Sequence, residues 1–229
     1  VSGNTVHIVG WTGSDCHYAG PSGTIGSYCP GNGGLIYYKS TNGGNSFGSS
    51  QTLDDFVDSW LTSATSMAVS GNNVHILSRE GGEVYYTRST NAGNSFSTTM
   101  LDSNGSGQAI AASGNNVYVG FDTGATFSIM RSDDNGNTFS PKGEIPSSHE
   151  MLEIAASGSN VFLVWKNYAP WNTSFARSTD NGANFETTYL LPAADNGYAG
   201  KWIPAASGNN VVIAGAVNSM IKMVTSSDS

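Results

Sequence analysis

The chain of 229 residues contains little charge, few cysteines and no long apolar run. Only 11% of its residues are charged, and 9 Lys+Arg against 17 Asp+Glu give a net charge of −8. An acidic chain without a basic stripe argues against nucleic acid or anionic lipid as a partner. The longest apolar runs span about five residues, as at 161–165, which is too short to cross a membrane. Aromatic residues make up 10% of the chain, so it has enough apolar surface to bury and disorder is not expected.

A repeated turn precedes the apolar runs. It reads Ser-Gly-Asn-Asn-Val or a close variant, and it begins at Ser2, Ser70, Ser113, Ser157 and Ser207. The runs that follow are apolar at consecutive positions, which predicts short strands buried on both faces. No segment shows a sustained helical period. The sequence therefore predicts an all-β fold.

A second repeat, which we call the box, reads Ser-x-Asx-x-Gly-x-Ser/Thr-Phe. Its copies begin 43 to 49 positions apart. The fourth copy has Asn184 in place of the hydroxyl residue, and a fifth begins at Ser226. The positions that recur in the four full copies are Ser40, Asn42, Gly44, Phe47, Ser89, Asn91, Gly93, Phe96, Ser132, Asp134, Gly136, Phe139, Ser178, Asp180, Gly182 and Phe185. Each box predicts a structural turn between two strands, with Gly supplying the positive φ.

The spacing of the repeats predicts a β-propeller of four-stranded antiparallel blades. We expect one propeller domain over 1–229, with blade units of approximately 1–54, 55–102, 103–145, 146–192 and 193–229. About four and a half blades are visible, because the first unit lacks the start of a strand and the last stops within a box. This predicts a fragment of a propeller with five or six blades.

The boxes resemble the Asp-box, or bacterial neuraminidase repeat, of sialidase-like β-propellers, and the resemblance covers essentially the whole chain. Asn42 and Asn91 stand where that family has Asp, and Asn can accept the same turn hydrogen bonds. The resemblance implies a sialidase-like propeller in which the boxes are structural and lie away from any active site. Fold alone does not carry function, so catalytic residues have to be sought separately.

A sialidase-like site requires an arginine cluster, a Tyr/Glu nucleophile pair and an Asp acid. Arg88, Arg131 and Arg177, like Lys39, occupy one repeat position just before the box, which indicates a structural role. Only Arg79 falls elsewhere. The segment 201–204, Lys-Trp-Ile-Pro, resembles the Phe-Arg-Ile-Pro motif of sialidases, but Trp202 replaces its Arg. We therefore predict no catalytic residue, with an atypical sialidase-like glycoside hydrolase as the alternative.

Strand polarity sorts the connections between strands into two ends of each blade. The Ser-Gly-Asn-Asn turns and the boxes share one end. The longer connections share the other, which we call the loop face, and they include the predicted loops 54–60, 149–150, 167–172 and 195–202. Aromatic residues on a loop face suit stacking on sugars or anchoring a protein partner. We predict ligand-binding residues there, namely Trp60, Tyr168, Trp171, Tyr198 and Trp202. The favoured function is a recognition or scaffold propeller that binds glycans or a protein.

Metal chemistry has weak support in the sequence. Asp54, Asp55 and Asp58 form the densest acidic group and offer the oxygen ligands that Ca²⁺ takes. Asp is mostly exposed, so a solvated acidic loop is the favoured interpretation, and we predict no metal and no cofactor. His7 and His75 share one repeat position inside second strands, which favours core packing over metal binding.

The two cysteines, Cys16 and Cys29, lie in one long Gly-rich segment. A disulfide across it would contribute about 3 kcal/mol and would suit an oxidising compartment, whereas a free pair in the cytosol is the alternative. Asn104 and Asn172 begin acceptable N-glycosylation sequons. We therefore expect a secreted or cell-surface protein, which associates with further propeller sequence or with another chain through its open ends.

Overall fold

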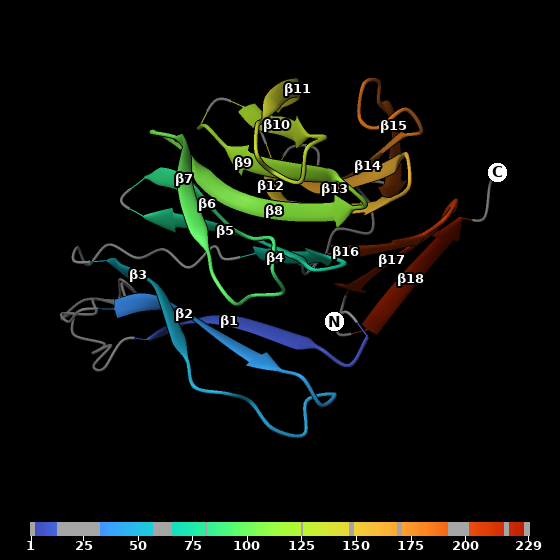
Figure 1. Cartoon of the computed structure of the whole chain (residues 1–229). Helices are drawn as coiled ribbons and strands as arrows, with labels where there is room; N and C mark the ends of the chain where they lie inside the picture. Colours follow the sequence, from blue (N-terminus) through green and yellow to red (C-terminus); the bar gives the residue numbers. More distant parts are fainter. Residues whose placement is uncertain are drawn as a thin grey trace, which may run out of the picture. The chain divides into compact units, whose positions relative to one another are not determined.

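The computed structural model is all-β and is built from antiparallel sheets (Figure 1). It describes residues 3–12, 33–56, 66–80, 82–124, 126–146, 149–168, 171–191, 202–217 and 220–226. The chain divides into two compact units, Val1–Asn104 and Gly105–Ser229, which are treated separately below. No helix with the length and hydrophobicity to span a bilayer occurs in the described ranges.

The first unit contains two sheets. One has the order β1-β2-β3, with β1 at Val6–Thr12, β2 at Gly33–Ser40 and β3 at Gln51–Phe56. The other has the order β4-β5-β6-β7. Its strands are β4 (Ser66–Ser70), β5 (Asn73–Glu80), β6 (Glu83–Ser89) and β7 (Ser97–Asp102).

The second unit contains three sheets, and in each of them strands that are consecutive in the chain pair with one another. The first two are four-stranded and the last is three-stranded across the described residues. Their strands are β8 (Ser106–Ser113), β9 (Asn116–Asp122), β10 (Thr126–Ser132), β11 (Ser140–Pro146), β12 (His149–Ser157), β13 (Asn160–Tyr168), β14 (Trp171–Ser178), β15 (Glu186–Leu191), β16 (Trp202–Ser207), β17 (Asn210–Val217) and β18 (Met220–Ser226).

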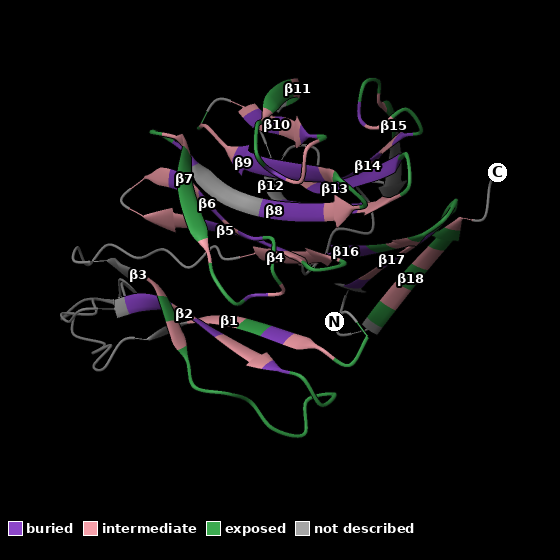
Figure 2. Cartoon of the chain, viewed as in Figure 1, coloured by how far each residue is buried: buried purple, intermediate pink, exposed green. Residues whose placement is uncertain are grey.

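The repeated apolar runs form the second strand of the sheets that begin at β4, β8, β12 and β16, as the sequence predicts, and the first run forms β1. In β5, Val74 and Ile76 are fully buried, and in β13 the run from Val161 to Trp165 is at most 5% exposed. Figure 2 shows this burial along β9 and β13. Successive residues of a strand point to opposite faces, so burial of consecutive residues means that both faces of these strands are covered.

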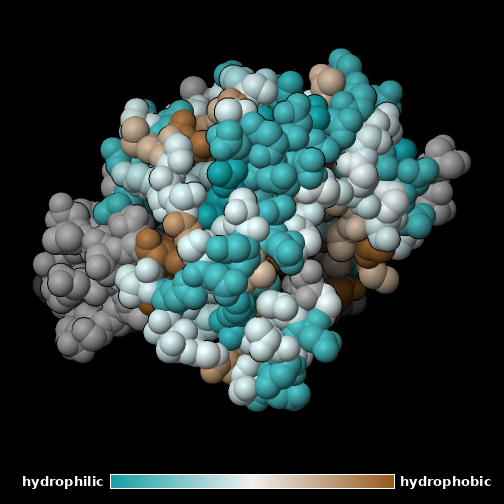
Figure 3. Space-filling view, viewed as in Figure 1, coloured by the Kyte–Doolittle hydropathy of each residue, from teal (hydrophilic) through white to brown (hydrophobic). Residues whose placement is uncertain are grey.

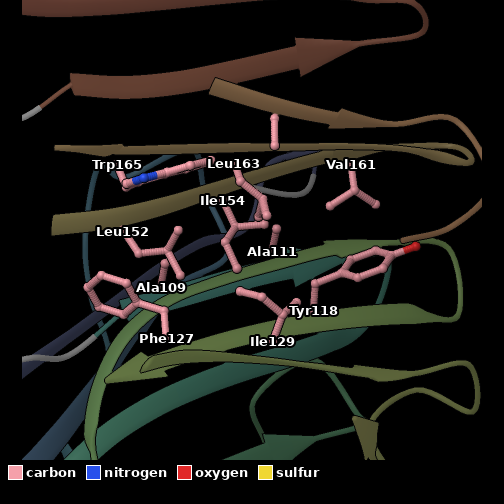
Figure 4. Close-up of a cluster of buried hydrophobic side chains, with 11 residues drawn as sticks. Ala109, Ala111, Tyr118, Phe127, Ile129, Leu152, Ile154, Val161, Leu163 and Trp165 are labelled. Atoms are coloured by element: carbon pink, nitrogen blue, oxygen red, sulfur yellow. The ribbon is translucent and has the colours of Figure 1, made fainter. Parts of the chain in front are cut away.

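Stacking of one sheet on the next forms the core of the second unit (Figure 4). Tyr118, Phe127 and Ile129 from β9 and β10 meet Leu152 and Leu163 from β12 and β13. A further cluster packs Phe162 and Val164 against Val211 and Ile213 of β17. The β12–β15 sheet thus uses both faces of its second strand, β13, to contact its two neighbours.

Three segments that the sequence predicts as loops are shorter than expected, because some of their residues belong to strands. Asp54 and Asp55 lie in β3, where they pair with Leu35 and Gly34. His149 and Glu150 open β12 and pair with Asn167 and Lys166. The predicted loop 167–172 is the end of a hairpin in which Tyr168 pairs with Trp171. Tyr and Trp are favoured in strands, which suits a ladder that continues to the hairpin tip.

Trp202 is also placed differently from the expectation of an exposed ring. It opens β16, is 4% exposed, and packs with Phe162 and Val164. Gly215 on β17 lies opposite, and a Cβ there would overlap the indole ring. Burial of a large aromatic surface stabilises this sheet junction, so Trp202 is a core residue and is removed from the candidate binding residues.

Candidate functional site

The four boxes form turns with one shared hydrogen-bond pattern. In each, the Ser hydroxyl donates to the Asx Oδ1, at 2.8 Å for Ser40–Asn42 and 2.7 Å for Ser132–Asp134. The same Ser Oγ accepts the N–H of the box Gly, at 2.7 Å for Gly136. The Gly residues have positive φ, 79° at Gly136, which the absence of a Cβ permits.

Asn and Asp complete these turns in opposite ways. Asn42 and Asn91 donate from Nδ2 to the hydroxyls of Ser46 and Ser95, both at 2.8 Å. Asp134 instead accepts from Thr138 Oγ1 at 2.7 Å, and Asp180 accepts from Asn184 Nδ2 at 2.7 Å. The hydrogen bond from Ser132 holds the pKa of Asp134 well below its usual range, and that from Asn184 does the same for the pKa of Asp180. Both chemistries close the same turn.

Each box turn is fixed to the neighbouring turn of its own sheet. Ala92 N–H donates to Asn72 O at 2.7 Å, and Asn135 N–H donates to Asn115 O at 2.9 Å. These contacts confirm within each sheet that the Ser-Gly-Asn-Asn turns and the boxes share one end. The Asx side chains at that end are occupied by structural hydrogen bonds.

The cationic residues that precede the boxes also hold turns. Lys39 Nζ donates to Ala92 O at 3.2 Å and to Asn94 Oδ1 at 2.5 Å, joining the two sheets of the first unit. Arg131 donates through Nε and Nη2 to Asn116 Oδ1, at 3.1 and 2.8 Å. Two N–H groups directed at one acceptor fix the guanidinium in place. These contacts support a structural role for this repeat position.

The opposite end of the first unit carries a polar hairpin tip. There β5 and β6 pair Ser78 with Tyr85 and Glu80 with Glu83, so these four residues share one face of the hairpin. Tyr85 Oη donates to Glu83 Oε2. Arg79 occupies the other face of the same tip, opposite Val84. A carboxylate, a phenol and a guanidinium are thereby gathered within one short hairpin.

In the second unit, the β13–β14 hairpin has a buried polar network. Trp165 Nε1 donates to Asn167 Oδ1 at 3.1 Å, and Asn167 Nδ2 donates to Ser174 Oγ at 2.7 Å. Asn167 and Ser174 are 7% and 2% exposed. Buried polar networks with satisfied partners hold a local geometry rigidly. Tyr168 and Trp171 occupy the directly opposed positions at the tip beyond this network.

Several predicted residues lie outside the described ranges, among them Trp60, Tyr198, Cys16, Cys29 and Asp58. The disulfide and the roles of these aromatic residues therefore stay predictions. Asn104 is exposed, and its N–H donates to Asp102 Oδ1 at 2.8 Å. Within the part of the chain that the structure describes, no group of three or more His, Cys, Asp or Glu side chains could hold a metal ion.

The Tyr85–Glu83 contact and the Asn167–Ser174 network were not predicted from the sequence. The Asn167–Ser174 contact depends on cross-strand register, which brings residues 7 positions apart in the chain within hydrogen-bond distance, whereas Tyr85 and Glu83 lie 2 positions apart on β6 and so face the same side of that strand. The signal was the presence of polar residues near the hairpin ends of strands that are otherwise apolar. Register is set by hairpin geometry, so it could not be assigned from composition.

No protein-family model matches the chain, and no curated protein matches it in sequence. Similar folds occur among solved structures. Trypanosoma rangeli sialidase in complex with sialic acid has a TM-score of 0.63 at 12% identity, over 99% of this chain and 45% of that one. The phage phi92 endosialidase has a TM-score of 0.57 at 11% identity, over 94% of this chain and 49% of that one.

A lectin has the same architecture. The Aleuria aurantia lectin, bound to alpha-methyl-L-fucoside, has a TM-score of 0.56 at 12% identity, over 86% of this chain and 68% of the lectin. The chain spans about a third to about half of the length of the sialidases it matches. At these identities the likeness shows the fold alone, a sialidase-like β-propeller fold.

Proposed function

We propose that the chain is a non-catalytic recognition propeller that binds glycans through its loop face. The observation that carries the proposal is the β13–β14 hairpin tip, where Tyr168 and Trp171 occupy opposed positions beyond a rigid polar network. Aromatic residues suit sugars because the apolar face of a sugar ring stacks on them, and a rigid network behind the tip holds the hairpin that carries them. Neighbours of the same fold include proteins bound to sialic acid and to a fucoside, which supports a glycan ligand.

The hydrogen bonds at the box end of the sheets are the reason for placing the binding site at the loop face. Box turns there use their Asx side chains to satisfy backbone N–H groups, and the cations Lys39 and Arg131 bind turn oxygens. A ligand would have to displace these bonds, whereas the hairpin tips are not bound to the box turns. Loops on a rigid scaffold are the usual place for binding residues.

We further propose that the boxes are Asp-boxes and that the protein acts outside the cytoplasm. The hydrogen bonds of Asp134 and Asp180 support the first point. Exposure of Asn104, the pair Cys16 and Cys29, and the neutral hydroxyl-rich composition support the second. A protein ligand in place of a glycan would use the same loop face.

A glycan-array experiment tests the binding proposal. The wild-type chain is compared with Trp171→Ala, Tyr168→Ala and a control, Thr99→Ala, whose side chain is exposed on β7. Loss of a stacked aromatic anchor costs about 2 kcal/mol, or about thirtyfold in affinity. We expect both aromatic variants to lose glycan signal and the control to keep it. Equal binding by all four proteins would contradict the proposed site.

One observation favours the alternative, a sialidase-like glycoside hydrolase. Tyr85 donates to Glu83 in a hairpin that also carries Arg79, and a tyrosine–glutamate pair is what a sialidase-like nucleophile requires. Hydrolysis of a fluorogenic sialoside that is abolished by Glu83→Gln, but retained by Glu80→Gln, would establish this alternative. The proposal of a binding protein predicts no turnover by any of the three proteins.

A further inference from the structure

Sheets within each unit stack by one rule. We call the face of a sheet that contacts the following sheet face A, and the face that contacts the preceding sheet face B. In the second unit, face A of β8–β11 (with Tyr118) meets face B of β12–β15 (with Leu163), and face A of β12–β15 (with Phe162) meets face B of β16–β18 (with Ile213). In the first unit, face A of β1–β3 (with Tyr37) meets face B of β4–β7 (with Ile76).

Face A of the last sheet is open. Register places Ile203, Ala214 and Met223 in one row across β16, β17 and β18, with Ile221 on the same face. Ile203, Ile221 and Met223 are 56%, 86% and 67% exposed. Figure 2 shows no buried residue on the described part of β18, and Figure 3 shows apolar surface in the region of β17 and β18. On face B of the same sheet, residues such as Trp202 and Ile213 are buried.

Face B of the first sheet is only partly covered. Register pairs Ile8 with Tyr38 and Gly10 with Ile36 on this face. Ile8 is 44% exposed, while Tyr38 and Ile36 are half-buried. Among the described residues of its own unit, no sheet covers face A of the last sheet, and none covers face B of the first.

We propose that face A of β16–β18 is a docking surface for face B of β1–β3 in a second copy of this chain. The contact would repeat the stacking of A on B found at three junctions within the units. Face A of β16–β18 has no charged residue, and face B of β1–β3 has one, Asp55, which pairs with Gly34 near the end of β3, so little of the net charge of −8 lies where the two faces would meet. Contiguous exposed apolar surface on a sheet is characteristic of an interaction site.

Such a contact is heterologous, because each copy uses two different surfaces. Heterologous contacts build rings or open chains rather than closed two-fold dimers. This gives the proposal a signature that does not depend on glycan binding. A protein with substitutions on face A keeps an intact face B, and a protein with a substitution on face B keeps an intact face A.

Light scattering after size exclusion, at concentrations from about 1 to about 100 μM, tests the proposal in the range where modest interfaces associate. We expect the average mass of the wild type to rise with concentration above 23.8 kDa. Ile221→Lys/Met223→Lys and, separately, Ile8→Lys should each stay at 23.8 kDa. Thr99→Lys, at an exposed position on β7, is the matched charge control and should behave as the wild type.

Mixing the two monomeric variants separates this geometry from others. One intact face A and one intact face B remain in the mixture, so we expect a dimer that grows no further. A wild type that stays at 23.8 kDa throughout would overturn the proposal. Association that survives Ile8→Lys, or a mixture that remains monomeric, would overturn the pairing of face A with face B.

Discussion

His75 is a buried histidine that the fold keeps neutral. Its side chain is fully buried, its Nδ1 lies 2.7 Å from Tyr86 Oη, and burial, with a smaller effect of Arg88, lowers its pKa to about 4. The unfolded chain binds the proton near pH 6.5, so it binds more protons than the folded chain between these values. The contribution of His75 to stability is therefore complete above pH 6.5 and is lost as pH falls toward 4.

This pH dependence can be removed without leaving a gap in the core. The equivalent pair in the second unit is Phe162 and Phe175, stacked with ring centroids 6.1 Å apart. We expect His75→Phe/Tyr86→Phe to lose part of the wild type's pH dependence between pH 6.5 and 4.5, which is at most about 1.4 kcal/mol per pH unit for one group. Urea unfolding at several pH values measures it. If the free energy of unfolding changed with pH equally in both proteins, the assignment to His75 would be refuted.

Gly93 illustrates a residue chosen for space as well as for backbone conformation. It has a φ of 77°, and a Cβ there would overlap the phenol of Tyr37. Gly71 has a φ of 58° and nothing within 4 Å of a built Cβ. We expect Gly71→Ala to cost about 1 kcal/mol from φ strain and Gly93→Ala about 2–4 kcal/mol, because steric overlap is added. Equal costs by urea unfolding would show that the phenol moves away freely.

Asp134 makes the box turn an acid-sensitive element. Its folded pKa is lowered by its hydrogen bonds, with Ser132 first, so its contribution is present above about pH 4 and is lost as pH falls. Asp134→Asn should keep the turn, since Asn42 closes the same turn by donating to Ser46. We expect the wild type to be more stable than the variant at pH 6 and this difference to shrink toward pH 2. A difference independent of pH would mean that the carboxylate contributes no charge-assisted bond.

At the level of elements, the sequence predicted the existence of the strands well. It predicted the residues at which they end less well. The repeats marked the second and third strands, because apolar runs and boxes recur in phase. The strand ends at Asp54, His149 and Trp171 were missed, since pairing across a hairpin depends on a partner strand that local pattern does not reveal. Trp202 was misplaced for the same reason, because its burial depends on Gly215 lying opposite.

At the scale of the whole molecule, the repeats predicted a propeller-type fold, and structural neighbours show that fold at 11–12% identity. The candidate site was predicted only in part. Strand polarity predicted that Tyr168 and Trp171 lie at the loop face, whereas the network of Trp165, Asn167 and Ser174 next to this tip emerged only with the register. Function lies in such local sites, and the neighbours of this fold include both sialidases and a lectin.

The central claim is that the chain binds glycans without cleaving them. Saturation-transfer NMR on mixtures of the chain with a sialylated and a fucosylated oligosaccharide measures both properties in one sample. We predict magnetisation transfer from the protein to at least one of the two sugars, reduced in Trp171→Ala, with no resonances of released monosaccharide over the time course. Release of free sialic acid, or absence of transfer to both oligosaccharides, would contradict the account.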